Sequence, residues 1–558
     1  MRALKILLVA FVLGALSLTA VGQQQPKLTE VVDKIVAQEQ EEMQSLRQYS
    51  PIVETYIQIL RPSKDRGAVP KGDKYYLGRA ELAKGVEIEP LINDGRAKHN
   101  MFGGLGRLVS MEFLPRGFLQ MIYLDTTGFN RQHYKFAYVG REFLGQVRCL
   151  VFDVDPVSKD ENGRFVGRIW VEDQDYRIVR FNGGYSSRSK SSYYFNFDSW
   201  RTNAGKNKWL PSFIYSEEAD NPLVQSFRAQ TRLWSYAPSQ DREEQELSKV
   251  VVEAPRPVSD QTDIGNDYSP LEQKRAWERQ AEDNIAAKME QLGLMARYGD
   301  VDKVLETVVN NIEVTNNLDI QPTVRCRVLM TSTMESFTMG HTIVLSRGLV
   351  DVLPDEGSLA AILAHELGHI VLRHHMGTQY AFFNRLRFDE KETFHHFGFI
   401  HTPEEEQAAT QEGMELLKKS PYKDHIGNAQ LFLQALNERS KEIPNLVSPH
   451  LGNRVVIGVT STSAVPTAET SASASEATGN LIAALPLGGR IKIEPWDNQL
   501  QMLKTKPVGT VAKDEVTPFE LTPFFLYLTR QGDNASTEVP GAVAVKSATD
   551  SDISDAKP

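Results

Sequence analysis

The sequence predicts a multidomain α+β protein, in which an antiparallel, β-rich N-terminal domain is followed by a mainly helical domain. The length of 558 residues suggests roughly two to four folded units at about 150 residues per domain. Short β-rich runs separated by turn sequences fill residues 70–245. Helical patterns then dominate residues 271–455, and a Ser/Thr/Ala-rich stretch at 456–480, which we expect to be a disordered linker, follows them.

Residues 1–22 have the features of a signal peptide. Arg2 and Lys5 give a positive start, residues 6–18 form a short apolar run, and Ala20-Val-Gly22 fits a small-x-small cleavage site. An uncleaved anchor is the alternative interpretation. No other stretch approaches the length of about 18 apolar residues that a membrane span needs. We therefore expect a periplasmic or secreted protein that is soluble after signal removal, with membrane association left open.

Residues 28–62 place apolar and charged positions at helical spacing, which predicts one or two helices, ending near Pro62, within an N-terminal segment at 23–69. From about residue 70 the pattern becomes that of an antiparallel β domain. Its large apolar side chains either line a ligand surface or pack the inner face of the sheet, and packing is the favoured interpretation. They are Phe165, Ile169, Trp170, Tyr176 and Ile178.

The second half of the chain begins with a polar, proline-containing linker predicted at 246–270. Helical patterns follow at 271–298 and 301–310, and β segments at 324–328 and 342–345. Beyond the linker at 456–480, residues 481–530 regain aromatic content and are expected to dock on a folded domain. The tail at 531–558 is predicted to be disordered.

Charge and cysteine content restrict the class of protein. A net charge of −10 without a long basic tract excludes a typical nucleic-acid-binding protein, which needs a basic face. The two cysteines, Cys149 and Cys326, lie in different predicted domains. They form either one disulfide or two buried thiols, and the second interpretation is favoured.

The helix predicted at 358–375 carries the chemistry. It is rich in alanine and leucine, follows Pro354, and has a candidate N-cap at Asp355. Within it, His365 and His369 are four residues apart, so both imidazoles project from one face about one turn apart. Two nitrogens at this spacing can bind one Zn²⁺ ion, and Glu366 can reach a water molecule on the ion without binding the ion itself. Two histidines on an ordinary packed helix are the alternative.

A third metal ligand has to come from elsewhere in the chain, and spacing alone does not choose it. Acidic candidates and competing histidines both follow the helix. They are Glu404, Glu405, Glu406, Glu412 and Glu415, with His374, His375, His395, His396 and His401. His374 and His375 are too close along the helix to bend back on the same ion, so we expect them to lie outside the first coordination shell.

The segment His365-Glu-Leu-Gly-His-Ile-Val-Leu-Arg-His374, preceded by Gly348-Leu349, resembles zinc metallopeptidase family M48, which includes the CaaX prenyl proteases, HtpX and the periplasmic BepA-like enzymes. The similarity runs over about residues 300–455. In that family the glutamate of a Glu-x-x-x-Asp helix is the third zinc ligand, a role that falls to Glu406. Thr410 then stands where the family has its aspartate. A slip of register to another glutamate is the competing explanation.

The resemblance implies roles for two further residues and suggests a function. His450 and Arg454 match loosely the histidine and arginine that the family places near the metal, where they could stabilise an oxyanion; an ordinary polar loop is the alternative. Thr410 could still offer its hydroxyl to an imidazole N–H, but loss of such an outer partner typically costs about 10–100-fold in metal affinity or activity. The expected protein is a zinc-dependent endopeptidase of the cell envelope, a zincin-type metalloprotease with Glu366 as general base.

The expected substrates are proteins or peptides, including misfolded envelope proteins, in a quality-control role. A second resemblance is weak: the hairpin series around Arg168–Phe181 is similar to LolA-like and RseB-like periplasmic proteins. It implies binding of a lipid, a lipoprotein or an unfolded outer-membrane protein. The alternative function is therefore a client- or lipoprotein-binding periplasmic protein with a latent or inactive metalloprotease domain, and Thr410 is the feature that supports it.

Overall fold

The structure is a computed structural model. It describes residues 28–63, 67–92, 115–126, 128–158, 162–187, 195–205, 208–218, 225–236, 270–374, 399–455, 480–482, 484–485, 487–505, 510–512 and 519–530. The predicted signal peptide at 1–22, the predicted tail at 531–558 and nearly all of the two predicted linkers at 246–270 and 456–480 lie outside the described residues.

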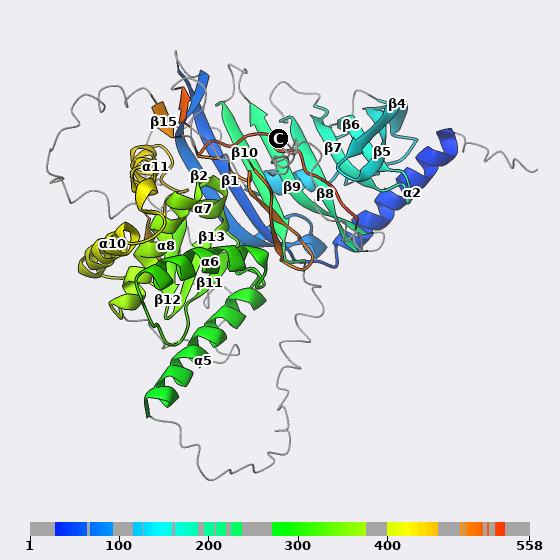
Figure 1. The fold of residues 1–558 in the computed structure, drawn as a ribbon. Coiled ribbons are helices and arrows are strands. Elements are labelled where there is room, and N and C mark those ends of the chain that lie inside the picture. Colours follow the sequence, from blue (N-terminus) through cyan, green and yellow to red (C-terminus); the bar gives the residue numbers. More distant parts are fainter. Residues whose placement is uncertain are drawn as a thin grey trace, which may run out of the picture.

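A ten-stranded antiparallel sheet forms the N-terminal domain, as predicted (Figure 1). Its strand order is β3-β2-β1-β10-β9-β8-β7-β6-β5-β4, so the first and last strands of the domain pair with each other inside the sheet. The strands are β1 (Ile52–Ser63), β2 (Gly67–Glu81), β3 (Glu87–Pro90), β4 (Tyr134–Leu144), β5 (Val147–Pro156), β6 (Phe165–Glu172), β7 (Ile178–Tyr185), β8 (Phe197–Gly205), β9 (Lys208–Glu218) and β10 (Phe227–Trp234).

The prediction of helices at 28–62 is right for α2 (Leu28–Leu46) and wrong for residues 52–63, which form β1. The sheet thus begins well before residue 70. The physical reason is that both faces of β1 are buried. Ile52 and Tyr56 belong to one hydrophobic core, whereas Val53 and Ile57 belong to the other. A strand covered on both sides loses the polar–apolar alternation of a half-exposed strand, and its apolar spacing imitates a helix.

Each face of the sheet is covered by other parts of the same chain. Helix α2 and the short elements α3 (Pro115–Leu119) and η4 (Gln120–Ile122) pack on one face. The second half of the chain packs on the other. The five large side chains that could have lined a ligand surface are instead part of these cores: four are buried and Tyr176 is partly buried. These positions bear out the packing interpretation.

The mainly helical domain surrounds a small sheet of order β11-β13-β12-β14 (Figure 1). The predicted helices and strands appear with shifted ends. The elements are α5 (Pro270–Gln291), α6 (Asp300–Thr315), β11 (Arg325–Leu329), β12 (Glu335–Met339), β13 (Thr342–Ser346), α7 (Arg347–Val352), α8 (Glu356–Val371), α10 (Pro403–Lys418), η6 (Lys423–His425), α11 (Ile426–Arg439) and β14 (Asn453–Arg454). Helix α8 packs on β12 and β13, with α10 and α11 beside it.

Two buried carboxylates join the large sheet to the helical domain. Glu54 of β1 accepts hydrogen bonds from the backbone N–H of Ser332 at 2.5 Å and its hydroxyl at 2.6 Å, and from Arg347 at 3.3 Å. Asp73 of β2 accepts the backbone N–H groups of Asn445 at 3.0 Å and Leu446 at 2.9 Å. Because buried charges are costly unless they are paired, these bonds fix the sheet against the domain that carries the candidate site.

The C-terminal part of the chain contacts both domains. Asp351 of α7 is fully buried and accepts the backbone N–H groups of Gly488, Arg490 and Ile491 at 3.1, 3.1 and 2.7 Å. Residues 519–530 then run over the large sheet (Figure 1), from Gln58 of β1, which bonds the backbone of Phe519 and Leu521, to Gln146, which donates its N–H to the carbonyl of Leu528. Short strands complete this part: β15 (Asn480–Ile482), β16 (Ile491–Ile493), β17 (Leu500–Met502) and β18 (Thr510–Ala512).

Cys149 of β5 and Cys326 of β11 are buried and not bonded to each other, in agreement with the buried-thiol interpretation. Burial raises the pKa of both thiols, that of Cys149 to about 12, which keeps them protonated at neutral pH. Among the described residues, no helix combines the length and the apolar character that crossing a membrane requires.

Candidate metal centre

Helix α8 presents two histidines to one point. The Asp355 side chain accepts the backbone N–H of Ser358 at 2.7 Å, so this residue is the predicted N-cap. Along the helix, His365 and His369 lie one turn apart with their Nε2 atoms 3.3 Å from each other. The side chain of His369 is only 1% exposed, whereas that of His365 is 25% exposed and faces an open cavity.

Helix α10 brings a carboxylate to the same point. Thr402 and Glu405 form a capping box that fixes the start of the helix, and Pro403 occupies its first turn. Glycines on both helices allow a close approach, because a Cβ at Gly413 would lie 2.7 Å from the carbonyl oxygen of Ala364, and one at Gly368 would lie 2.5 Å from that of Ala409. This close packing places Glu406, which is largely buried, beside the two histidines.

The donor atoms of the three residues lie within 4.8 Å of one another, close enough to share one ion. One carboxylate oxygen of Glu406 lies 3.2 Å from His365 Nε2, and the other lies 3.4 Å from His369 Nε2. Bonds of about 2.0–2.1 Å at tetrahedral angles separate neighbouring donors by about 3.3–3.4 Å. Two imidazoles and one carboxylate also form a known catalytic zinc ligand set. The residues therefore fit the ion, and the assignment of His365, His369 and Glu406 as ligands stays a prediction supported by this geometry.

Each histidine has a second partner that orients its ring. Thr410 donates its hydroxyl proton to the carbonyl oxygen of Glu406 at 2.8 Å, so its oxygen can accept the Nδ1–H of His365 at 3.2 Å. His374 Nδ1 lies 2.8 Å from His369 Nδ1. A proton on Nδ1 of both ligand histidines leaves Nε2 of each unprotonated, which is the tautomer that binds a metal ion. Thr410 thus stands where an orienting aspartate would act.

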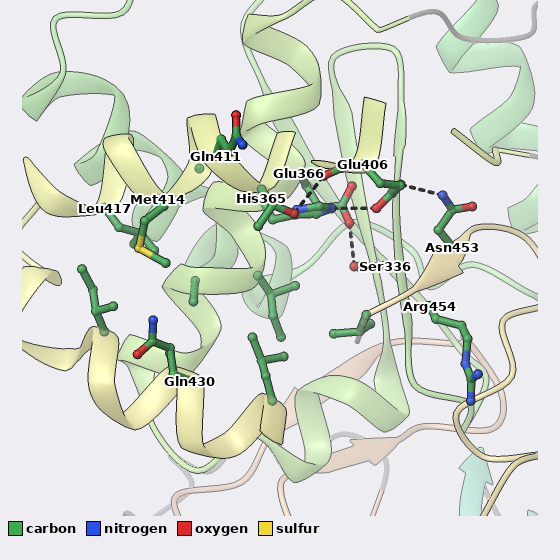
Figure 2. A pocket seen from close by; sticks show the side chains of 18 of the residues that line it. Ser336, His365, Glu366, Glu406, Gln411, Met414, Leu417, Gln430, Asn453 and Arg454 are labelled. Carbon is green, nitrogen blue, oxygen red and sulfur yellow. Dashed lines mark hydrogen bonds and ion pairs between the residues drawn. The ribbon is translucent and has the colours of Figure 1, made fainter. Parts of the chain in front are cut away.

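The Glu406 carboxylate is oriented from the opposite side. Asn453 of β14 donates its side-chain amide to Glu406 Oε1 at 2.6 Å and to the carbonyl oxygen of His401 at 3.0 Å (Figure 2). The His401 ring stacks on His369 with centroids 4.0 Å apart. Asn453 was not identified from the sequence, because it lies in a short loop strand with no motif of its own.

Glu366 is buried next to the three donors and is held by a residue that sequence analysis missed. Ser336 of β12 donates its hydroxyl to Glu366 Oε1 at 2.6 Å (Figure 2). Since this bond engages one oxygen, the other oxygen is the one that can accept a proton. Burial raises the pKa of the Glu366 carboxyl, against the opposing effect of the nearby histidines. A raised pKa brings a carboxylate closer to the range in which it can both take and return a proton near neutral pH.

The other ionisable groups of the cluster are shifted in ways that suit a cation site. Burial opposes ionisation of Glu406, but the hydrogen bonds that His365 and His369 donate when protons take the place of a metal ion on their Nε2 atoms outweigh it and hold the pKa of this carboxyl well below its usual range. The carboxyl is therefore charged at neutral pH. Burial and the neighbouring His369 lower the pKa of His401 to about 4, so its imidazole is neutral at pH 7.

The remaining acidic candidates do not belong to a group of donors, in the part of the chain that the structure describes, that could share an ion. Among the described residues, two groups of His, Cys, Asp and Glu have donor atoms close enough to share an ion: the one formed by His365, His369 and Glu406, and a second that combines His369 with His374 and His401. Neither contains Glu404, Glu405, Glu412 or Glu415. His375, His395 and His396 lie outside the described residues.

The structure does not bring His450 and Arg454 to the donor atoms. The His450 ring stacks on Tyr75 with centroids 5.3 Å apart, and its backbone N–H bonds Glu335 at 3.0 Å. Arg454 lines the cavity, but its guanidinium group points away from the His365–Glu406 pair (Figure 2). Their assignment to oxyanion stabilisation stays a prediction without geometric support.

A cavity of about 1040 Å³ opens beside the donors. His365, Glu366 and Glu406 line it together with Ser336 and Asn453. Ligand pockets typically measure about 300–1,000 Å³, so a substrate larger than a single side chain can enter.

Two histidines one helical turn apart, a carboxylate from a neighbouring helix and a buried glutamate define a metal centre of the HExxH class. Residues 296–402 match the model of Peptidase family M48, which confirms the family resemblance for that part of the chain and indicates a metallopeptidase domain. The match contains His365, Glu366 and His369 and ends before Glu406. The third ligand therefore rests on the geometry described above.

A search of curated proteins gives no significant match. Among the solved structures that match is an inferred outer membrane lipoprotein-sorting protein domain from Vibrio parahaemolyticus. It has 11% sequence identity and a TM-score of 0.20, and the alignment covers 39% of this chain and 97% of that domain. Its description as a lipoprotein-sorting domain is of the kind that the hairpin series resembles.

Proposed function

We propose that the protein is a zinc-dependent endopeptidase in which His365, His369 and Glu406 bind the metal ion and Glu366 is the general base. The observation that supports this most strongly is that two imidazoles and a carboxylate have donor atoms within 4.8 Å of one another, with a buried glutamate beside them. An ordinary packed helix would not need these polar groups in its interior, because burying them costs free energy.

The residues around the centre have separable tasks. When bound, zinc supplies Lewis-acid chemistry: it lowers the pKa of water to about 7 and polarises a peptide carbonyl. Glu366 accepts the water proton on the oxygen that Ser336 leaves free and returns it to the leaving amine. Ser336 prevents the carboxylate from turning toward the metal ligands. Thr410 and Asn453 hold His365 and Glu406 in the orientation that the chemistry requires.

We further propose that the enzyme acts in the cell envelope on protein or peptide substrates, such as misfolded proteins. The support is the signal-peptide pattern of residues 1–22 and the resemblance to the periplasmic branch of the family. The client-binding alternative has less support, because the five large side chains of the sheet that could have lined a ligand surface are packed in the two cores of the described part of the chain.

The function is tested with the Glu366→Gln variant, because an amide cannot accept the proton while its shape is nearly the same. The mature protein and the variant are compared for casein cleavage and self-cleavage at equal zinc content. Glu404→Gln, the same change at an exposed position of α10, is the matched control. We expect at least about a hundredfold loss for Glu366→Gln and none for the control. Equal, background-level activity of all three proteins would instead support the client-binding alternative.

The metal ligands are tested separately by zinc content. Zinc should be lost from Glu406→Ala and retained by Glu404→Ala and Glu412→Ala. Retained zinc in the Glu406 variant would contradict the assignment of the third ligand, whatever the activity of the protein.

A further inference from the structure

The cavity next to the metal centre has two unlike halves. On one side it is bordered by polar groups of β12 and β14, including Ser336 and Asn453. On the other side it continues away from His365 as a groove between α10 and α11, with α8 as its floor (Figure 2). This second half, which we call the helix groove, has no role in the chemistry assigned so far.

The walls of the helix groove are mostly apolar. Its apolar lining side chains are contributed by all three helices: Ala361, Ile362, Met414, Leu417, Ile426, Ala429 and Leu433. The uncharged amides of Gln411, Gln430 and Gln434 line it as well. The charged lining residues beyond the metal centre on this side are Lys418 and Glu415, which are exposed and pair with each other at 2.6 Å. The apolar surface is therefore not crossed by an unpaired charge within the described residues.

The groove meets the reacting groups directly. Ala361 lies one turn before His365 on the same face of α8, and both line the cavity, as does Glu366. Ala361, Met414 and Leu433 are only partly buried, so part of the apolar surface faces the cavity. A side chain that enters the groove from a peptide bond held at Glu366 would bury apolar surface at about 25 cal/mol per Å². A charged side chain would lose its hydration there, while the charged lining residues Glu415 and Lys418 already pair with each other.

We propose that the helix groove is the specificity site of the enzyme, and that it takes a large apolar side chain, such as leucine, methionine or phenylalanine, next to the scissile bond. This inference rests on the proposed peptidase function. Leu433 of α11 and Ala361 of α8 are specificity-determining residues: Leu433 supplies apolar wall and Ala361 supplies depth, because a larger side chain at its position would fill the groove. Since the groove lies on one side of the metal centre, the preference applies to one side of the cleaved bond.

The test uses peptides that are identical except for the residue on one side of the cleaved bond, which is Leu, Phe, Ala, Glu or Lys. One methylene in an apolar pocket changes kcat/KM by about 10–200-fold. We expect the zinc-loaded wild type to cleave the Leu and Phe peptides at least about tenfold better than the Ala peptide, and the charged peptides least. The position of the cut is read from the masses of the products.

Two leucines of α11 provide a matched pair of variants. Leu433→Lys places a cation in the helix groove, whereas Leu431→Lys makes the same change at a position that is 46% exposed and does not line the cavity. In Leu433→Lys, kcat/KM should fall at least about tenfold for the Leu and Phe peptides and rise for the Glu peptide. Leu431→Lys should rank the peptides by kcat/KM in the same order as the wild type. Ala361→Phe provides a second variant, which should no longer cleave the Leu and Phe peptides efficiently but should still cleave the Ala peptide.

The outcomes separate the two proposals. If the zinc-loaded wild type cleaves none of the peptides, the endopeptidase proposal is overturned, and this inference with it. Cleavage without a preference for large apolar residues, or a preference that is the same in Leu433→Lys and in Leu431→Lys, overturns the inference alone. Zinc content is measured for each variant, so that loss of the metal is not mistaken for a change of specificity.

Discussion

Replacement of Gly413 by alanine tests whether the close crossing of α8 and α10 sets the geometry of the metal centre. The new Cβ would lie 2.7 Å from the carbonyl oxygen of Ala364 and 2.9 Å from the Cα of His365. Relief to an ordinary contact of 3.4 Å requires the helices to move apart by about 0.7 Å. Functional side chains have to be held within about 0.5 Å of their productive geometry. The shift is therefore large enough to spread His365 and Glu406.

Two opposing free-energy changes determine the stability of this variant. Overpacking costs typically about 1–3 kcal/mol, whereas exchanging glycine for alanine inside a helix gains about 1 kcal/mol. We expect the free energy of unfolding to fall by about 0–2 kcal/mol and the zinc affinity to fall by at least about tenfold. The larger effect on the metal than on stability is the distinctive part of the prediction.

The assay for Gly413→Ala is competition for zinc with a chromophoric chelator, together with urea unfolding. Gly427→Ala is the control, because it makes the same change in α11 where an added Cβ has open space. The control should keep wild-type zinc affinity and be as stable as the wild type or slightly more so. If Gly413→Ala also bound zinc with wild-type affinity, the proposed dependence of the site on the helix crossing would be refuted.

Three further predictions concern two orienting residues and one buried acid. Thr410→Val removes the acceptor for His365 Nδ1 and should weaken zinc binding about tenfold in the same titration; unchanged affinity would contradict an orienting role. His374→Ala removes the partner of His369 Nδ1 and should weaken binding about 10–100-fold, with partial recovery in His374→Gln, whose amide oxygen can accept; no recovery would count against the hydrogen bond. Glu42 of α2 is buried beside Arg177, and burial raises the pKa of its carboxyl from 4.5 to about 7 against the opposing effect of nearby arginines. Between these two values the native state keeps a proton that the unfolded chain loses, so the free energy of unfolding should fall by about 3 kcal/mol as pH rises from about 4.5 to about 7. Urea unfolding at several pH values should show this slope in the wild type and lose it in Glu42→Gln, and equal slopes would refute the assignment.

The chemical centre could largely be predicted from the sequence because its main signal is local. The spacing of His365 and His369 within one helix gives their relative position, and the N-cap at Asp355 indicates where that helix begins. Glu406 needed the family resemblance, since spacing alone could not distinguish it from neighbouring glutamates. The structure now places its carboxylate at the point where both imidazoles meet.

The parts that were missed depend on contacts between distant segments. Ser336 lies 30 residues from Glu366 in sequence, and Asn453 lies 47 residues from Glu406. Neither belongs to a periodic pattern or a motif. The same holds for Glu54, whose role in joining the two domains follows from its partner Ser332, 278 residues away. Strand β1 was misassigned because two cores bury its opposite faces, which removes the local signal of a strand.

The bonds of Asp351 with Gly488, Arg490 and Ile491 have a consequence for the synthesis of the protein. A nascent chain that has emerged as far as residue 455 already contains every candidate ligand, but it lacks the three backbone amides that compensate this buried carboxylate. It also lacks residues 519–530, which complete the covering of the large sheet. Translation as far as residue 530 therefore precedes completion of the fold, and the order of synthesis delays full assembly around the metal centre until these later residues have been made.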